Sequence, residues 1–114
     1  MASSFESSAS HSHPLLQPLR LPSLKDGIYG TAKELLDDLP EYTLDSEDEA
    51  KGELTARRKA RLLGGESKVV ILVDGMEGIP STTVTVRSET SSGLLKHDKS
   101  NVMEIVKLLS HRVV

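Results

Sequence analysis

Two runs in the C-terminal half of the chain have the spacing of β-strands. Lys68–Val73 (KVVILV) is a continuous, largely β-branched run, which is typical of a strand buried on both faces. Thr82–Arg87 (TTVTVR) alternates, so Val84 and Val86 share one face of a strand. Asp74-Gly75 ends the first run and a short loop separates the two. We therefore expect an antiparallel hairpin.

The period changes to that of a helix near the end of the sequence. Residues 99–111 place one apolar stripe along a helix, and Asn101 and Glu104 have the spacing of a capping box. The stripe consists of Val102, Ile105, Val106 and Leu109. Such a stripe would cover one face of the hairpin, so residues 67–114 are predicted to form a ββα core.

Two further helices are predicted upstream. Thr31 and Glu34 can form a capping box for a helix over 31–39, and Pro40 would stop it. A second helix would begin at Ser46, with Glu49 in the capping-box position, and end before Gly64 and Gly65. Gly52 would lie inside this helix at a cost of about 1 kcal/mol relative to alanine.

The first 26 residues are rich in Ser, His and Pro, and Pro14, Pro18 and Pro22 recur every fourth position. That spacing breaks helices, so we expect a disordered tail. The predicted fold class is α+β: a small ββα unit, made of a two-stranded antiparallel hairpin and a C-terminal amphipathic helix, preceded by one or two helices and the tail. The predicted boundaries are 1–26 for the tail, 27–66 for an acidic-then-basic helical segment and 67–114 for the core.

Composition narrows the function classes. The chain has 114 residues, no Cys, no Trp, one Phe and two Tyr, which allows at most one domain. Lack of Cys excludes disulfides and thiolate chemistry, and few aromatic residues disfavour a base-stacking surface for RNA. No apolar run approaches the roughly 18–20 residues that cross a bilayer, so we expect no membrane contact and a cytoplasmic or nuclear location.

Charge is distributed in blocks. Residues 34–49 contain eight acids and no Lys or Arg, whereas residues 51–61 contain five bases and one acid. Leucines among the acids suggest an apolar edge for a protein partner, with Leu35, Leu36, Leu39 and Tyr42 as its contacts. The bases suggest a basic strip on the second helix, formed by Arg57, Arg58, Lys59 and Arg61.

The basic strip has three interpretations that the sequence leaves open. It could bind nucleic acid, direct nuclear import, or only complement the dipole of its own helix. Ser46 precedes three acids (Glu47, Asp48, Glu49), which is the pattern of an acid-directed phosphorylation site. A phosphate there would lie at the predicted helix N-terminus, where anions are favoured.

We identify no catalytic, cofactor-binding or metal-binding residues. Asp74-Gly75 resembles the end of a strand that carries an aspartate in phosphate-binding enzymes. The Gly-rich loop with Lys that such sites require is missing from the sequence, so we interpret Asp74-Gly75 as a turn. His11 and His13 lack further ligands. The predicted function is that of a non-enzymatic adaptor or regulatory protein, acting on a protein partner through its helical segment and forming a homodimer. The alternative is a small RNA-sequestering protein of viral accessory type.

Overall fold

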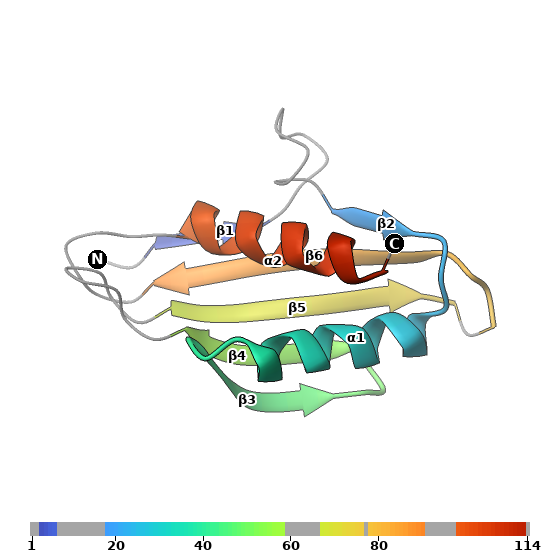
Figure 1. Cartoon of the computed structure of the whole chain (residues 1–114), viewed down its shortest axis with the longest axis horizontal. Helices are drawn as coiled ribbons and strands as arrows, with labels where there is room; N and C mark the ends of the chain where they lie inside the picture. The colour runs from blue at the N-terminus through green and yellow to red at the C-terminus, as the bar shows by residue number, and fades with distance from the viewer. Residues whose placement is uncertain (1–2, 7–17, 59–66, 77, 91–97, 114) are drawn as a thin grey trace.

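The computed structural model describes residues 3–6, 18–58, 67–76, 78–90 and 98–113. These residues form one antiparallel sheet with two helices lying across the same face (Figure 1). The strand order is β1–β6–β5–β4–β3, and β2 also pairs with β6.

The centre of the sheet is the hairpin expected from the sequence. β5 (Ser67–Gly75) and β6 (Thr82–Thr90) pair antiparallel, with Ile71 opposite Val86. β4 (Glu53–Arg58) continues the sheet beyond β5, and β3 (Tyr42–Asp48) follows at the edge. The hairpin is therefore the interior of a larger sheet, which gives both of its strands a second neighbour.

Two short strands cover the other side of β6. β1 (Ser3–Glu6) pairs with its C-terminal half and β2 (Leu19–Leu21) with its N-terminal half, both antiparallel. The predicted ββα unit was therefore wrong, and so was the disordered tail for residues 3–6 and 18–26; the rest of that predicted tail lies outside the described residues. The error has a physical cause. The strand propensity of Leu19–Leu21 is weak, and its extended conformation is stabilised by pairing with β6, which the local sequence does not reveal.

Both helices bury an apolar stripe against the sheet. α2 (Asp98–Val113) buries Val102, Ile105, Val106 and Leu109, as its spacing predicts. Asn101 lies inside this helix and is buried, so it does not cap it. α1 (Lys25–Asp38) begins six residues before the predicted cap at Thr31, and ends just before Leu39, which is extended ahead of Pro40.

The two faces of the sheet differ. Alternate residues of the three central strands are fully buried under the helices, and they are Leu54, Ala56, Val69, Ile71, Val73, Val84 and Val86. The residues between them lie on the outer face, where Leu72 is 39 % exposed and Val70 is half-buried. The prediction that β5 is buried on both faces was therefore wrong.

The predicted helix from Ser46 to Leu63 was also wrong. β3 and β4 occupy its first part, joined by a turn in which Gly52 has a φ of +71°. That conformation suits glycine, so the residue that weakened the helix prediction is the one the turn requires. Leu54 and Ala56 pair with Ile71 and Val69, and this tertiary pairing outweighs the local capping signals.

Candidate functional site

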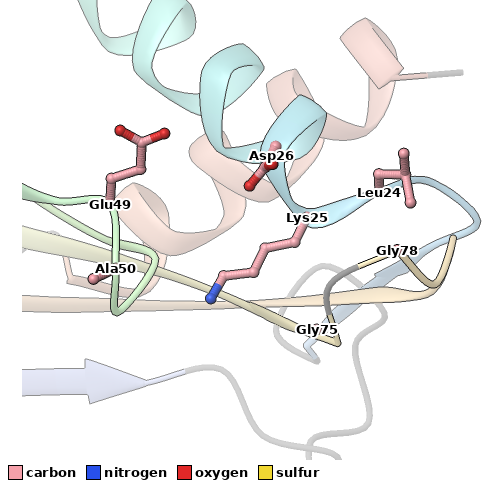
Figure 2. A pocket seen from close by; sticks show the side chains of 7 residues that line it. All are labelled: Leu24, Lys25, Asp26, Glu49, Ala50, Gly75 and Gly78. Atoms are coloured by element: carbon pink, nitrogen blue, oxygen red, sulfur yellow. The ribbon is translucent and has the colours of Figure 1, made fainter.

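A hollow of about 310 Å³ opens at one end of the sheet (Figure 2). Three segments line it: the start of α1, the β3–β4 turn and the β5–β6 turn. The lining residues are Leu24, Lys25, Asp26, Glu49, Ala50, Gly75 and Gly78. Segments distant in sequence therefore meet at one surface feature.

Large apolar side chains are exposed at the same end. Met76 is 70 % exposed, Leu24 49 % and Ile79 44 %. Met76 and Ile79 belong to the turn that also carries Gly75 and Gly78, and Leu24 lines the hollow directly. We call Leu24, Met76 and Ile79 the apolar rim. Exposed apolar groups gathered beside a hollow are typical of binding surfaces.

Sequence reasoning missed this surface. The β5–β6 turn reads as an ordinary Gly/Pro loop, and two large apolar residues within it were the available signal. No local pattern in the sequence indicates that Leu24 and Glu49 lie at the same place. Only the folded chain brings these residues together.

A second cluster is polar and lies between the sheet and α2. The Tyr42 hydroxyl donates a hydrogen bond to Glu104 Oε1 at 3.0 Å. Arg58 is 9 % exposed, its guanidinium carbon is 5.6 Å from the centre of the Tyr42 ring, and its Nε is 3.6 Å from Glu104 Oε1. Arg58 Nε has no hydrogen-bond acceptor among the described residues. Next to this cluster, Asn101 Nδ2 donates to Ser88 Oγ at 3.1 Å.

Two tyrosines have altered acidity. Burial raises the pKa of Tyr42, and the adjacent Glu104 carboxylate raises it further. Burial also raises the pKa of Tyr29, together with Glu47 and other acids of β3 and its turn, and the Tyr29 hydroxyl has no hydrogen-bond partner among the described residues. Both shifts move the phenols away from neutral pH, opposite to what an acid–base catalyst needs.

The leucines predicted to contact a partner are in the core. Leu35 and Leu36 are each 1 % exposed, Tyr42 is buried, and Leu39 packs partly buried against the same cluster. Burial explains their apolar periodicity. Contact of these four residues with a partner remains a prediction, and the folded single chain keeps Leu35 and Leu36 below its surface.

Strand geometry separates the residues of the predicted basic strip. Arg57 lies on the outer face with its Nε 2.8 Å from the Asp45 carboxylate, whereas Arg58 points to the inner face. Lys59 and Arg61 lie outside the described residues. The helical strip is therefore absent from the described part of the chain, because alternate residues of β4 face opposite ways.

Ser46 is exposed on β3, where it pairs with Thr55, so it does not lie at the N-terminus of a helix. Part of the acidic run around it is neutralised within the chain. Glu47 forms a 2.8 Å ion pair with Lys33, and Asp38 forms one of the same length with Arg112. The acid excess is thus smaller in the folded chain than in the sequence.

Among the described residues, no group of three or more His, Asp or Glu side chains is placed to hold a metal ion. Within that same part of the chain, no helix has the length and apolarity to span a bilayer.

Comparison of the whole fold identifies a class of architecture. An antiparallel sheet gripped on one face by two helices, the longer one C-terminal, resembles the helix-grip or Bet v1-like fold. Norcoclaurine synthase from Thalictrum flavum, a point mutant bound to a transition-state analogue, aligns with a TM-score of 0.60 and 13 % identity, covering 98 % of this chain and 96 % of that one.

Two more solved structures support the same fold. The ZhuI aromatase/cyclase from Streptomyces sp. R1128 aligns with a TM-score of 0.57 and 8 % identity, over 98 % of this chain and 86 % of that chain. Ara h 8.0201 aligns with a TM-score of 0.57 and 12 % identity, over 99 % and 98 %. No protein-family model and no curated protein matches the chain. At such low identity these similarities establish the fold alone.

Proposed function

We propose that this chain is a non-enzymatic interaction protein, an adaptor or regulatory subunit, that binds a protein partner at the end of the sheet carrying the apolar rim. The supporting observation is the exposure of Leu24, Met76 and Ile79 at the end of the sheet where the hollow opens. Exposed apolar groups cost solubility unless a partner covers them.

This proposal keeps the class of function expected from the sequence and changes the surface. Leu35 and Leu36 hold the core, so replacing them by Ala would lower stability by about 2–5 kcal/mol each and would not report on binding. The apolar rim is exposed, so its residues can be changed without opening the core.

The test is affinity capture from the native host with a Met76→Ser, Ile79→Ser double variant. Loss of a partner that the unaltered chain retains, after nuclease treatment, is the expected result. Leu72→Ser is the matched control, because Leu72 is also an exposed apolar residue but lies on the outer face of the sheet. Equal capture by both variants and the unaltered chain contradicts the proposed surface.

Nucleic-acid binding is the second proposal, and one observation favours it. Arg57 lies directly opposite Lys68 on the outer face of the sheet. Two acids weaken this positive pair, since Asp45 binds Arg57 and Glu89 is opposite Lys68. In a gel mobility-shift experiment, the protein should retard duplex RNA at low salt, and its affinity should fall steeply as the salt concentration rises. An Arg57→Ser, Lys68→Ser variant should no longer retard the RNA. Absence of a shift at micromolar protein rules this function out.

Location in the cytoplasm or nucleus stays a prediction. Fluorescence microscopy of a tagged chain in the native cell checks it, and nuclear accumulation that disappears on changing Arg57, Lys59 and Arg61 to Ser would assign an import role to the basic segment.

A further inference from the structure

We propose that the hollow beside the apolar rim receives a partner segment in which one large apolar side chain is flanked by Lys or Arg. This inference rests on the proposed function and adds the chemistry of the partner. Three properties of the hollow support the inference: its walls, its charge and the hydrogen bonds that hold its walls together.

The apolar part of the recognition comes from the rim. Leu24 forms one wall, and Gly78 of the β5–β6 turn leaves open space, because a Cβ added there meets no atom within 4 Å (Figure 2). A volume of about 310 Å³ is at the low end of the range of about 300–1,000 Å³ for drug-sized ligand sites. The hollow therefore has room for one large apolar side chain together with part of the backbone that carries it, and Met76 and Ile79 are exposed in the adjacent turn.

The charged part comes from two carboxylates in the lining. Asp26 and Glu49 are both exposed, and neither takes part in an ion pair among the described residues. They differ in this from Asp38, Asp45 and Glu47, each of which is paired with a base of the chain. Lys25 is the single base of the lining, so the hollow carries a formal charge of −1 and has two carboxylates open to a partner cation.

The walls are held in place before any partner arrives. Val73 N–H donates to the Gly52 carbonyl at 2.7 Å, which ties the β3–β4 turn to β5. Thr82 Oγ1 donates to the Ser23 carbonyl at 2.7 Å, which ties the segment before α1 to β6. Because these bonds join all three walls, binding needs little ordering of the backbone, and affinity is gained from that preorganisation.

An anionic membrane is the competing occupant, since exposed Met76 and Ile79 could enter a bilayer. The open carboxylates of Asp26 and Glu49 argue against it. Anionic lipids attract polybasic surfaces and repel acidic ones. The observations therefore favour a basic, apolar protein segment.

The experiment is an NMR titration of the ¹⁵N-labelled full chain with three synthetic nine-residue peptides. The first has a central Leu flanked by Lys, the second replaces Lys by Glu, and the third keeps Lys and replaces Leu by Ser. Only the first should shift the amide signals of the lining, at Leu24–Asp26, Glu49, Ala50, Gly75 and Gly78. Equal binding of the Glu peptide, or no shift of these signals at millimolar peptide, overturns the inference.

Two variants with the same charge change sharpen the result. Asp26→Asn with Glu49→Gln should weaken binding of the Lys–Leu peptide about tenfold at low salt, and less at high salt. Glu34→Gln with Asp37→Asn is the control, because both residues are exposed on α1 outside the lining. Equal weakening by the two double variants would mean that net charge, not the hollow, attracts the peptide, and would falsify the inference.

Failure of this inference differs from failure of the proposed function. Suppose that Met76→Ser, Ile79→Ser abolishes partner capture, while Asp26→Asn, Glu49→Gln leaves both capture and peptide affinity intact. The proposed interaction surface would then be supported, and the inference of a basic partner segment would be wrong. Co-sedimentation with vesicles of phosphatidylcholine and phosphatidylserine tests the membrane. Binding to vesicles that the Met76→Ser, Ile79→Ser variant loses overturns the inference in favour of a lipid surface.

Discussion

At the scale of single residues, two glycines of this chain have opposite roles. Gly27 lies in the first part of α1, and a Cβ added there meets no atom within 4 Å. Gly52 has a positive φ, and a Cβ there would clash with the Val73 carbonyl oxygen. The first glycine only adds freedom to the unfolded chain, whereas the second is required by the β3–β4 turn.

Gly27→Ala is therefore expected to stabilise the protein by about 0.4–1 kcal/mol, because it reduces the entropy of the unfolded chain. Gly52→Ala should destabilise it by more than that, since both its φ and its space are wrong for a side chain. Urea unfolding of the two variants measures both effects. Similar changes in the two midpoints would contradict the assignment of Gly52 to a turn and Gly27 to a helix.

The buried tyrosines give a second comparison. Tyr42→Phe loses the hydrogen bond to Glu104 and should cost about 1 kcal/mol, while Tyr29→Phe removes a buried hydroxyl without a described partner and should be neutral or stabilising. Thermal unfolding at pH 7 checks the pair. A larger loss for Tyr29→Phe than for Tyr42→Phe would show that the Tyr29 hydroxyl has a partner in solution.

Alkaline pH tests the raised pKa of Tyr42. Above its ordinary value of 10.0, the unfolded chain releases the phenolic proton while the folded chain retains it. The unfolded state then binds fewer protons, so stability is complete below pH 10 and falls as pH rises past it. In urea unfolding curves measured over a series of pH values, the free energy of unfolding of Tyr42→Phe should fall less steeply above pH 10. An unchanged slope would contradict the raised pKa of Tyr42.

At the scale of elements, periodicity predicted the helix and the strand whose apolar spacing is visible in the local sequence, and it missed a strand that depends on pairing with another strand. The spacing of Val102 to Leu109 and of Val84 to Val86 is enough to predict α2 and the inward face of β6. β3 has no such run, because five of its seven residues are Thr, Ser, Asp or Glu. Its extended form comes from pairing with β4, which local sequence does not encode.

Ser46 shows how an element changes a functional hypothesis. At a helix N-terminus a phosphate would stabilise the chain, but on β3 it lies beside Asp45 and on the same face as Asp48. Ser46→Glu, which imitates the phosphate, is expected to destabilise by about 0.5 kcal/mol, more at low salt. Thr43→Glu is the control, since Thr43 is opposite Arg57 and should tolerate the charge.

Urea unfolding at low and high salt separates the two variants. Stabilisation by Ser46→Glu would indicate that the segment forms a helix after all. Phosphorylation itself stays a prediction, which mass spectrometry of the protein from its native cell tests directly.

At the scale of the whole molecule, the sequence predicted an α+β chain with a helix-covered hairpin and missed the larger sheet to which the hairpin belongs. The same limit applies to the candidate site. The acidic and basic runs were visible, but alternation along β4 divides Arg57 from Arg58, and only folding joins Leu24, Glu49 and Gly78 around one hollow. Proximity of distant segments is a property of the tertiary structure, so no single run of residues reveals it.

The expected homodimer also belongs to this scale. β4, β1 and β2 pair with both edges of the central hairpin, so the hairpin itself has no open edge for a second copy. Of the described edges, β3 carries a bulge between Leu44 and Ser46 and several acids, which discourage pairing between copies. On the outer face of the described strands, Leu72 is the single large apolar side chain that is exposed by more than a third. The homodimer stays a prediction, and sedimentation equilibrium tests it with an expected mass of twice the 12.4 kDa of the chain. A mass of 12.4 kDa at every concentration removes the homodimer and leaves the apolar rim as the interaction surface.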